Sequence, residues 1–296
     1  MDNNLNITYI TIDAYVELDK YRFVYFVIMF TAYILIICSN STIVCLIVIH
    51  KNLHEPMYIF IAALLLNSVF YSTALYPKIL FDVLSEKQII SYLACVFQYY
   101  VYYTLAASEF LLLTAMSYDR YVSICKPLQY PTIMRKTNIC ILLVVAWILP
   151  AGQFAVPAAV IIFCNNQIYK LFCVPSRPIT VFGVLFLLNV SVFPVFFILF
   201  TYTRILIICY HSSGEVRRKA AQTCLPHLMV LFNYFFLLTY DIITVRLETD
   251  FPKTARLVMT LQLVVYNPLF NPIIYGLKMK EICKHLKKLF CQDSFK

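Results

Sequence analysis

The stretch MSYDRYVSICKPLQY, residues 116–130, joins an apolar segment to a basic one. In the long apolar run before it, Glu109 is the only charged residue. Basic residues come at its end and after it, namely Lys126 within the stretch and Arg135 and Lys136 beyond it. Asp119 and Arg120 therefore lie where an apolar segment ends and a basic one begins. The pattern of the rest of the chain indicates why a charged pair occurs at that position.

The composition of the whole chain indicates a membrane protein. Of its 296 residues, 61% are hydrophobic and only 13% are charged, and the mean hydropathy is +0.77. A soluble domain normally carries about a quarter charged residues. The membrane class is therefore indicated before any motif is considered.

The apolar runs predict an all-α seven-transmembrane helix bundle. A helix needs roughly 20 residues to cross a hydrocarbon core about 30 Å thick, and barrel strands would be about 10 alternating residues instead. We expect one domain in which residues 1–22 precede the first helix. The seven helices are expected at about 23–50, 57–81, 90–122, 138–162, 179–208, 219–243 and 254–277.

The remaining residues, 278–296, predict a short amphipathic helix and a tail at the inner membrane face. Ile282, Leu286 and Leu289 recur at helical spacing with lysines between them, as in helices that lie in a membrane interface. A disordered basic tail is the alternative that the same residues leave open.

The distribution of basic residues predicts the orientation. With the N-terminus outside, fifteen of the 24 Lys and Arg residues face the cytoplasm, as the positive-inside rule requires. Asn6 then starts a glycosylation sequon on the outer side. The basic excess suits a membrane surface, so nucleic acid is not an expected partner.

Eleven cysteines are present, of which Cys95, Cys164 and Cys173 fall near the outer, oxidising side. One disulfide and one unpaired thiol are therefore expected there. The chain has no CxxC pair, no HExxH or GxSxG motif and only four glycines, so neither a zinc site nor an enzyme is indicated.

The third span carries an inward-facing stripe, because six of its residues follow each other at steps of four and three: Tyr102, Ala106, Glu109, Leu113, Met116 and Arg120. A carboxylate at mid-membrane depth is costly unless it faces the bundle interior and finds a partner. Glu109 therefore fixes which face points inward. Tyr102 then lies towards the outside and Arg120 towards the cytoplasm. Asp119 and Arg120 suit either a switch or a plain anchor at the interface.

The seventh span contains the sequence NPLFNPIIY, residues 267–275. Pro268 and Pro272 each remove a helical hydrogen bond, which frees the carbonyl groups of Val264 and Pro268. We expect the side-chain amides of Asn267 and Asn271 to satisfy such carbonyls. The kink suits a hinge or simple packing, and the sequence leaves both open.

Taken together, several stretches resemble the rhodopsin-like G-protein-coupled receptors, and within them the odorant (olfactory) receptors. The similarity covers nearly the whole chain, and TCLPHL and LYPKIL look like the fish branch. The matching elements are Asn40, LHEPMY (53–58), MSYDRYVSICKPLQY, Trp147, Thr201–Tyr202, RRKAAQTCLPHL (217–228) and NPIIYGLKMKEI (271–282).

The resemblance implies a small-molecule odorant as ligand and a heterotrimeric G protein of the stimulatory, olfactory type as partner, which raises cyclic AMP. It implies a multi-pass protein of the plasma membrane, in olfactory sensory neurons. Our ligand-pocket candidates, each of which also suits ordinary packing, are Tyr102, Tyr103, Ala106, Phe186, Asn189, Leu238, Asp241 and Leu261. The coupling and switch residues implied are Asp119, Arg120, Tyr202, Arg217, Arg218, Lys219, Asn271, Pro272 and Tyr275.

The resemblance also implies a mid-membrane polar pocket formed by Asn40, Glu109 and Asn271, where receptors of this kind hold sodium or water. Sodium is the only cofactor that the resemblance implies. It implies a Cys95–Cys173 disulfide as well. One departure is that the second span has Asn67 and Ser68 where these receptors usually carry an aspartate.

Two other functions stay open at this stage. The first is a rhodopsin-like receptor for a non-odorant ligand, although an amine receptor would be expected to carry a carboxylate near the position of Tyr102. The second is an ion channel or transporter with Glu109 on the ion path. The sequence shows no internal repeat in favour of the second.

Overall fold

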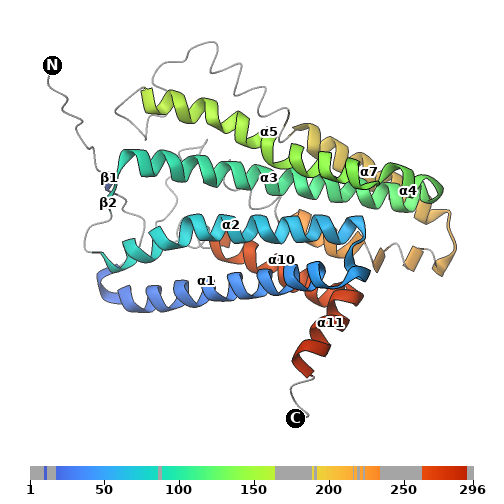
Figure 1. The fold of residues 1–296 in the computed structure, drawn as a ribbon, viewed down its shortest axis with the longest axis horizontal. Helices are drawn as coiled ribbons and strands as arrows, with labels where there is room; N and C mark the ends of the chain where they lie inside the picture. Colours follow the sequence, from blue (N-terminus) through green and yellow to red (C-terminus); the bar gives the residue numbers. More distant parts are fainter. Residues whose placement is uncertain are drawn as a thin grey trace.

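The computed structural model describes residues 10–11, 18–85, 89–163, 189, 192–215, 217–218, 221–222, 224–233 and 262–291. Within these residues the chain is a bundle of long helices that run side by side (Figure 1). The main elements are α1 (Leu18–Ile49), α2 (Pro56–Leu84), α3 (Tyr92–Cys125), α5 (Lys136–Phe163), α7 (Phe193–Tyr210), the π-helix η4 (Gln262–Tyr266), α10 (Asn267–Lys278) and α11 (Lys280–Cys291). Cys224–Asn233 is a further apolar helix.

The first four helices each run a little longer than predicted, and local chemistry explains two of the starts. α2 begins at Pro56, where the missing N–H group of proline costs nothing because a first-turn N–H has no helical partner. α3 begins after Ser91, whose hydroxyl accepts the N–H of Ala94 at 3.4 Å. The predicted segments 179–188, 234–243 and 254–261 lie outside the described residues.

Short elements join the helices at the two ends of the bundle. At the inner end, the 3-10 helix η1 (Lys51–Leu53) joins α1 to α2, and η2 (Pro127–Gln129) with α4 (Tyr130–Ile133) follows α3. At the outer end, β1 (Ile10–Thr11) pairs antiparallel with β2 (Ile89–Ile90), so the N-terminal segment contacts the connection between α2 and α3.

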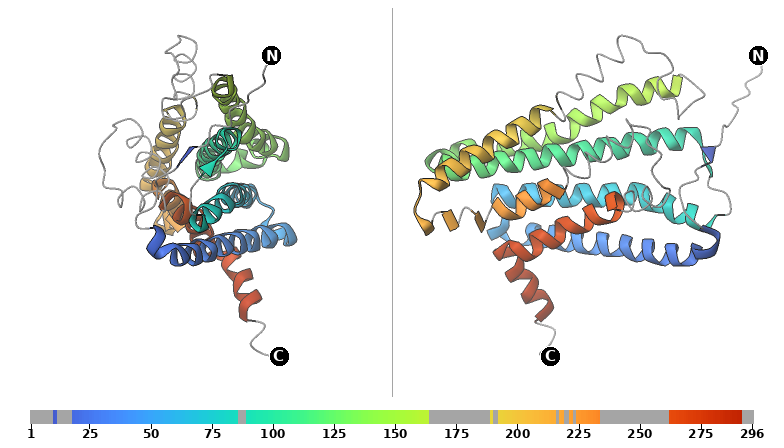
Figure 2. Two further views of the ribbon diagram at one scale, coloured as in Figure 1. Left: turned by 90° about the vertical axis from the view of Figure 1, so that its left-hand side faces the viewer. Right: turned by 180° about the vertical axis from the view of Figure 1, so that it is seen from behind.

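α3 is the central helix of the described bundle, since it contacts α2, α5 and α7 (Figure 2). α1 covers the other side of α2 and also contacts α10. Four of the described helices, α1, α2, α5 and α7, contain stretches long and apolar enough to cross a membrane. In lipid, helices associate through close packing and interhelical hydrogen bonds. The hydrophobic effect does not drive this association, because lipid tails are as apolar as the side chains they contact.

Asn67 provides one of these interhelical junctions. Its Nδ2 donates to the carbonyl oxygen of Leu105 in α3 at 2.9 Å, and the indole N–H of Trp147 in α5 donates to its Oδ1 at 3.2 Å. One amide thus holds α2, α3 and α5 together.

α11 confirms the predicted short helix after residue 278. It leaves the bundle at Met279 and runs across the direction of the other helices (Figure 1). Gly276 allows a close contact between α10 and α11, because a Cβ there would lie 3.2 Å from Leu286 Cδ1, which is tighter than ordinary packing. On the α1 side, the imidazole rings of His285 and His50 are in contact, with centroids 3.9 Å apart and planes tilted by 47°.

We predict that acidification loosens the packing of α11 against α1. Burial lowers the pKa of His285 below its usual range, and His50 and Lys288 lower it further, against a smaller opposing effect of Glu281. The docked state therefore favours the neutral ring. Its contribution is intact above the ordinary histidine pKa of about 6.5 and is lost as the pH falls below that value.

Spin-label distances between α1 and α11, measured at about pH 7.5 and about pH 5.5, check this prediction, because both values bracket the ordinary histidine pKa. His285→Phe keeps a ring on His50 but cannot titrate, so it should hold one distance at both pH values. An equal pH response in this variant would contradict the role of His285.

Candidate functional site

Glu109 lies in the interior of the bundle, as the α3 stripe predicts, and is only 4% exposed. The Nδ2 of Asn267 donates to both carboxylate oxygens, at 3.1 and 3.0 Å, and the Nδ2 of Asn271 donates to Oε1 at 2.9 Å. Two neutral amides of α10 thus satisfy a buried acid of α3, which would otherwise be costly to bury.

The carbonyls freed by Pro268 and Pro272 of α10 are satisfied from other helices. Asn40 in α1 donates to the carbonyl oxygen of Pro268 at 3.0 Å, and the hydroxyl of Tyr76 in α2 donates to that of Val264 at 3.3 Å. The expectation that Asn267 and Asn271 would do this is wrong. Their amides bond to the Glu109 carboxylate, which is a stronger acceptor than a carbonyl.

Some buried oxygen atoms in the described interior of the bundle lack a hydrogen-bond partner. Among the described residues, Asn40 Oδ1, Asn271 Oδ1 and Ser72 Oγ are buried and make no hydrogen bond. Ser68 faces the same pocket, with its Oγ 3.5 Å from Asn271 Nδ2, whereas Asn67 points away to α3 and α5. The described residues contain no cluster of three His, Cys, Asp or Glu that could hold a metal ion.

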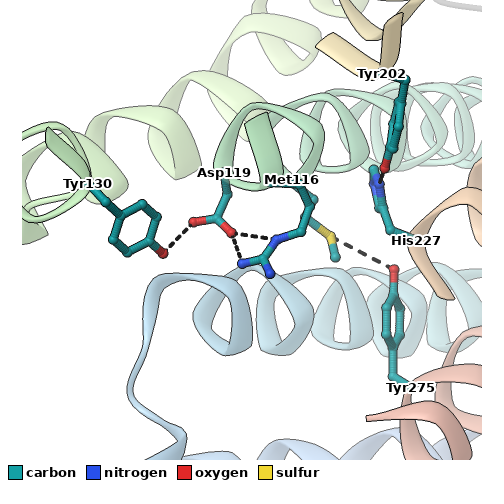
Figure 3. Close-up of polar contacts among 7 residues, drawn as sticks. Met116, Asp119, Tyr130, Tyr202, His227 and Tyr275 are labelled. Atoms are coloured by element: carbon teal, nitrogen blue, oxygen red, sulfur yellow. Dashed lines mark hydrogen bonds and ion pairs between the residues drawn. The ribbon is translucent and has the colours of Figure 1, made fainter. Parts of the chain in front are cut away.

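At the inner end of α3, Arg120 is paired with its neighbour Asp119 (Figure 3). Both side chains are buried, and Arg120 Nε donates to Asp119 Oδ2 at 3.0 Å. The hydroxyl of Tyr130, in α4, donates to Asp119 Oδ1 at 2.8 Å. Burial and the nearby carboxylate raise the pKa of Tyr130, so this hydroxyl keeps its proton and remains a donor.

His227 is a site residue that the sequence reasoning missed. It is buried, it hydrogen-bonds to the hydroxyl of Tyr202 in α7, and its Nε2 lies 3.0 Å from the carbonyl oxygen of Leu113 in α3. Helix Cys224–Asn233 is thereby fastened to two neighbours. Tyr275 reaches the same region, with its hydroxyl 4.0 Å from Met116 Sδ (Figure 3). A polar residue within an apolar helical stretch was the available signal.

At the outer end, the predicted pocket residues of α3 lie in a cluster of aromatic rings. The ring of Tyr102 lies 5.5 Å from that of Tyr71 and 5.0 Å from that of Tyr103, which stacks on Phe154 at 5.6 Å. Ala106 is half-buried one turn below.

Several predicted site residues are not part of this geometry. Asn189, Arg217 and Arg218 are exposed. Cys95 is a free thiol in the structure, and its expected disulfide partner lies outside the described residues, so the bridge stays a prediction. The predicted residues outside the described part of the chain are Asn6, Cys173, Phe186, Lys219, Leu238, Asp241 and Leu261.

Comparison with known proteins decides the family. The sequence profile described as Olfactory receptor matches residues 28–293. The chain belongs to the olfactory receptor family. It is 34% identical to human Olfactory receptor 6K3, covering 98% of this chain and 91% of that protein. It is 31% identical to human Olfactory receptor 11A1, with 97% and 95% covered.

Membership of the olfactory receptor family establishes a seven-transmembrane, multi-pass receptor and excludes an enzyme. Receptors of this family generally bind small-molecule odorants and couple to G proteins. Within that role, the geometry above places an aromatic cluster at the outer end of α3, a buried acid in its middle and a paired arginine at its inner end.

We predict that Asn40→Leu lowers the stability of this receptor by about 1–3 kcal/mol, the usual cost of leaving a buried polar group without its partner. The carbonyl oxygen of Pro268 would lose its donor in a buried site. The unfolding midpoint of detergent-solubilised receptor measures the effect.

Thr42→Val is the matched control. It removes only the hydrogen bond from the Thr42 hydroxyl to the Cys38 carbonyl oxygen, which lies within α1 and is exposed. A surface change of this kind normally stays within about 0.5 kcal/mol. An Asn40→Leu variant as stable as Thr42→Val would show that the Pro268 carbonyl needs no donor.

Proposed function

We propose that this receptor binds a small odorant in the outer half of the bundle and activates a stimulatory, olfactory-type G protein, which raises cyclic AMP. The observation that carries the proposal is the single stripe on α3. Tyr102 lies in the outer aromatic cluster, Glu109 bonds to α10, and Arg120 lies buried at the inner end of the same helix.

The ligand end of the proposal involves Tyr102, Tyr103 and Ala106, together with Asn189 and with Phe186, Leu238, Asp241 and Leu261 from outside the described residues. An odorant shifts a conformational equilibrium only by the difference between its affinities for the two states. That difference is commonly about 1–3 kcal/mol. Contacts of a ligand with Tyr102 would be transmitted along a rigid α3 and through the Tyr71 ring to α2.

Activation of the G protein depends on the contacts that hold helix Cys224–Asn233 in the bundle. For this helix to move outward, the hydrogen bond between His227 and the Leu113 carbonyl has to break. Arg120 then has to leave Asp119 to meet the partner, and Tyr202 and Tyr275 become available to stabilise the open form. Asn271 and Pro272 supply the kinked segment of α10 that adjusts. The basic residues Arg217, Arg218 and Lys219 precede the moving helix on the cytoplasmic side.

We propose the plasma membrane of olfactory sensory neurons as the location, with the N-terminus extracellular, Asn6 glycosylated and a Cys95–Cys173 disulfide. The support is the excess of basic residues on the side of η2, α4 and α11, which the positive-inside rule assigns to the cytoplasm.

The test needs no known ligand, because the fastening of His227 can be removed directly. We expect His227→Phe to raise ligand-independent cyclic AMP in expressing cells by about five- to tenfold, since losing about 1–1.4 kcal/mol of net hydrogen bonding shifts a two-state equilibrium by that factor. Arg120→Ala, added to His227→Phe, should abolish the rise.

His211→Phe is the matched control, because His211 is exposed at the end of α7. Antibody binding to an N-terminal tag on intact cells gives the surface level and also tests the orientation. Unchanged basal cyclic AMP in His227→Phe at equal surface level, or a rise that survives Arg120→Ala, would contradict the mechanism.

We also propose a sodium ion in the pocket of Asn40, Glu109 and Asn271. The support is the pair of buried oxygens, Asn40 Oδ1 and Asn271 Oδ1, that make no hydrogen bond among the described residues, because small hard cations take oxygen ligands. Replacing sodium by a large organic cation should raise the basal cyclic AMP of His227→Phe receptor, and Glu109→Gln should remove this salt effect. Equal salt effects with Glu109 and with Gln would exclude the ion from this pocket.

A further inference from the structure

Two histidine rings are in direct contact where the inner end of α1 meets α11. His50 follows the last residue of α1, and His285 lies in the middle of α11. Their imidazole centroids are 3.9 Å apart, and both side chains are half-buried. Ile282, which is completely buried, and Leu286, which packs over Gly276, hold α11 in the rotation that makes this contact. The histidine pair therefore belongs to a defined junction between two helices.

Hydrogen bonds to the two rings determine which nitrogen of each ring carries a lone pair. His50 Nδ1 lies 3.0 Å from the carbonyl oxygen of Leu46, so Nδ1 carries the proton and Nε2 has the lone pair. His285 Nε2 lies 3.2 Å from Asn52 Nδ2, and because an amide nitrogen only donates, this Nε2 has a lone pair as well. A ring N–H bonded to a backbone carbonyl, as in His50, is the usual support behind a histidine that binds a metal.

We propose that His50 and His285 bind a zinc ion through their Nε2 atoms and that the ion joins α11 to α1. Neutral imidazole is a preferred ligand of Zn²⁺, with a bond of about 2.0–2.1 Å. One ion bonded to both rings in a tetrahedral arrangement would place their centroids about 5 Å apart, so the rings have to separate by only about 1 Å. Small side-chain rotations allow this separation, and for His285 the bond to the metal replaces the bond to Asn52.

The surroundings of the histidine pair predict a reversible site that water completes. The described residues contain no group of three His, Cys, Asp or Glu side chains that could hold a metal ion, so the protein supplies two ligands. Zinc binds water where a protein ligand is missing. Glu281, one turn before His285, favours a positive charge at that ring, whereas Lys284 and Lys288 oppose it. We therefore expect weaker binding than at a structural zinc site with four protein ligands.

The test measures binding of zinc chloride to detergent-solubilised full-length receptor at about pH 7.5, where free histidine is mostly neutral. The double variant His50→Phe/His285→Phe gives the background from the eleven cysteines of the chain. We expect His50→Phe and His285→Phe each to weaken the site at least tenfold, since the loss of a residue that only supports a metal ligand already costs about 10- to 100-fold. Phenylalanine keeps a ring in the contact, and the unfolding midpoint shows that each variant is folded.

His54→Phe is the matched control, because His54 is exposed in the same turn and its Nε2 lies 3.1 Å from the carbonyl oxygen of Val48. It should leave the zinc affinity unchanged, and His285→Cys should retain binding, because a thiolate is also a zinc ligand. Zinc should slow amide hydrogen exchange in α11 of the unaltered receptor but not of His285→Phe. Equal zinc affinity in the unaltered receptor and the double variant would overturn the proposal. So would an equal loss in His54→Phe and His285→Phe, or zinc binding that leaves exchange in α11 unchanged.

Discussion

The hydrogen bonds between the Glu109 carboxylate and the amides of Asn267 and Asn271 are the interaction on which the rest of the bundle depends. A carboxylate within the membrane has few tolerable positions, and this one is satisfied only when α3 and α10 face each other at the correct depth. The rotation of α3 follows from that contact. So does the placement of an aromatic cluster at one end of the helix and a paired arginine at the other.

Several interhelical hydrogen bonds of the described bundle end on backbone carbonyls, and these carbonyls are of two kinds. Those of Val264 and Pro268 have lost their helical donors to proline, so Tyr76 and Asn40 are their replacements. The carbonyl of Leu113 lies in the regular part of α3 and accepts from His227 with its second lone pair. Breaking the first kind leaves a buried group unsatisfied, whereas breaking the second does not. α1, α2 and α10 are therefore joined by bonds whose loss leaves a buried carbonyl unsatisfied. Helix Cys224–Asn233 can leave the Leu113 carbonyl without that cost, but its bonds to Tyr202 and Asn267 have to break as well.

How much of this the sequence could predict depends on how local each cause is. The inward direction of Glu109 follows from spacing and the cost of burying a charge, and the loss of two carbonyl partners follows from the prolines alone. The donors that replace those partners come from α1 and α2, and their choice depends on tertiary packing that no local pattern contains. The contacts of His227 and Tyr130 were missed for the same reason, since each joins residues from different elements. The rotation of α11 was predictable only in part, because the spacing indicates an apolar face but not that His50 meets it.

Asn67 also has a practical consequence. Trp147 is the only tryptophan of the chain, and its indole N–H donates to the amide of Asn67, which in turn holds α3. The tryptophan fluorescence of this protein therefore comes from Trp147 alone and reports on its hydrogen bond to Asn67. A shift in its wavelength would register separation of α2 from α5 without any attached dye, so the receptor carries a built-in fluorescent reporter of the junction between α2, α3 and α5.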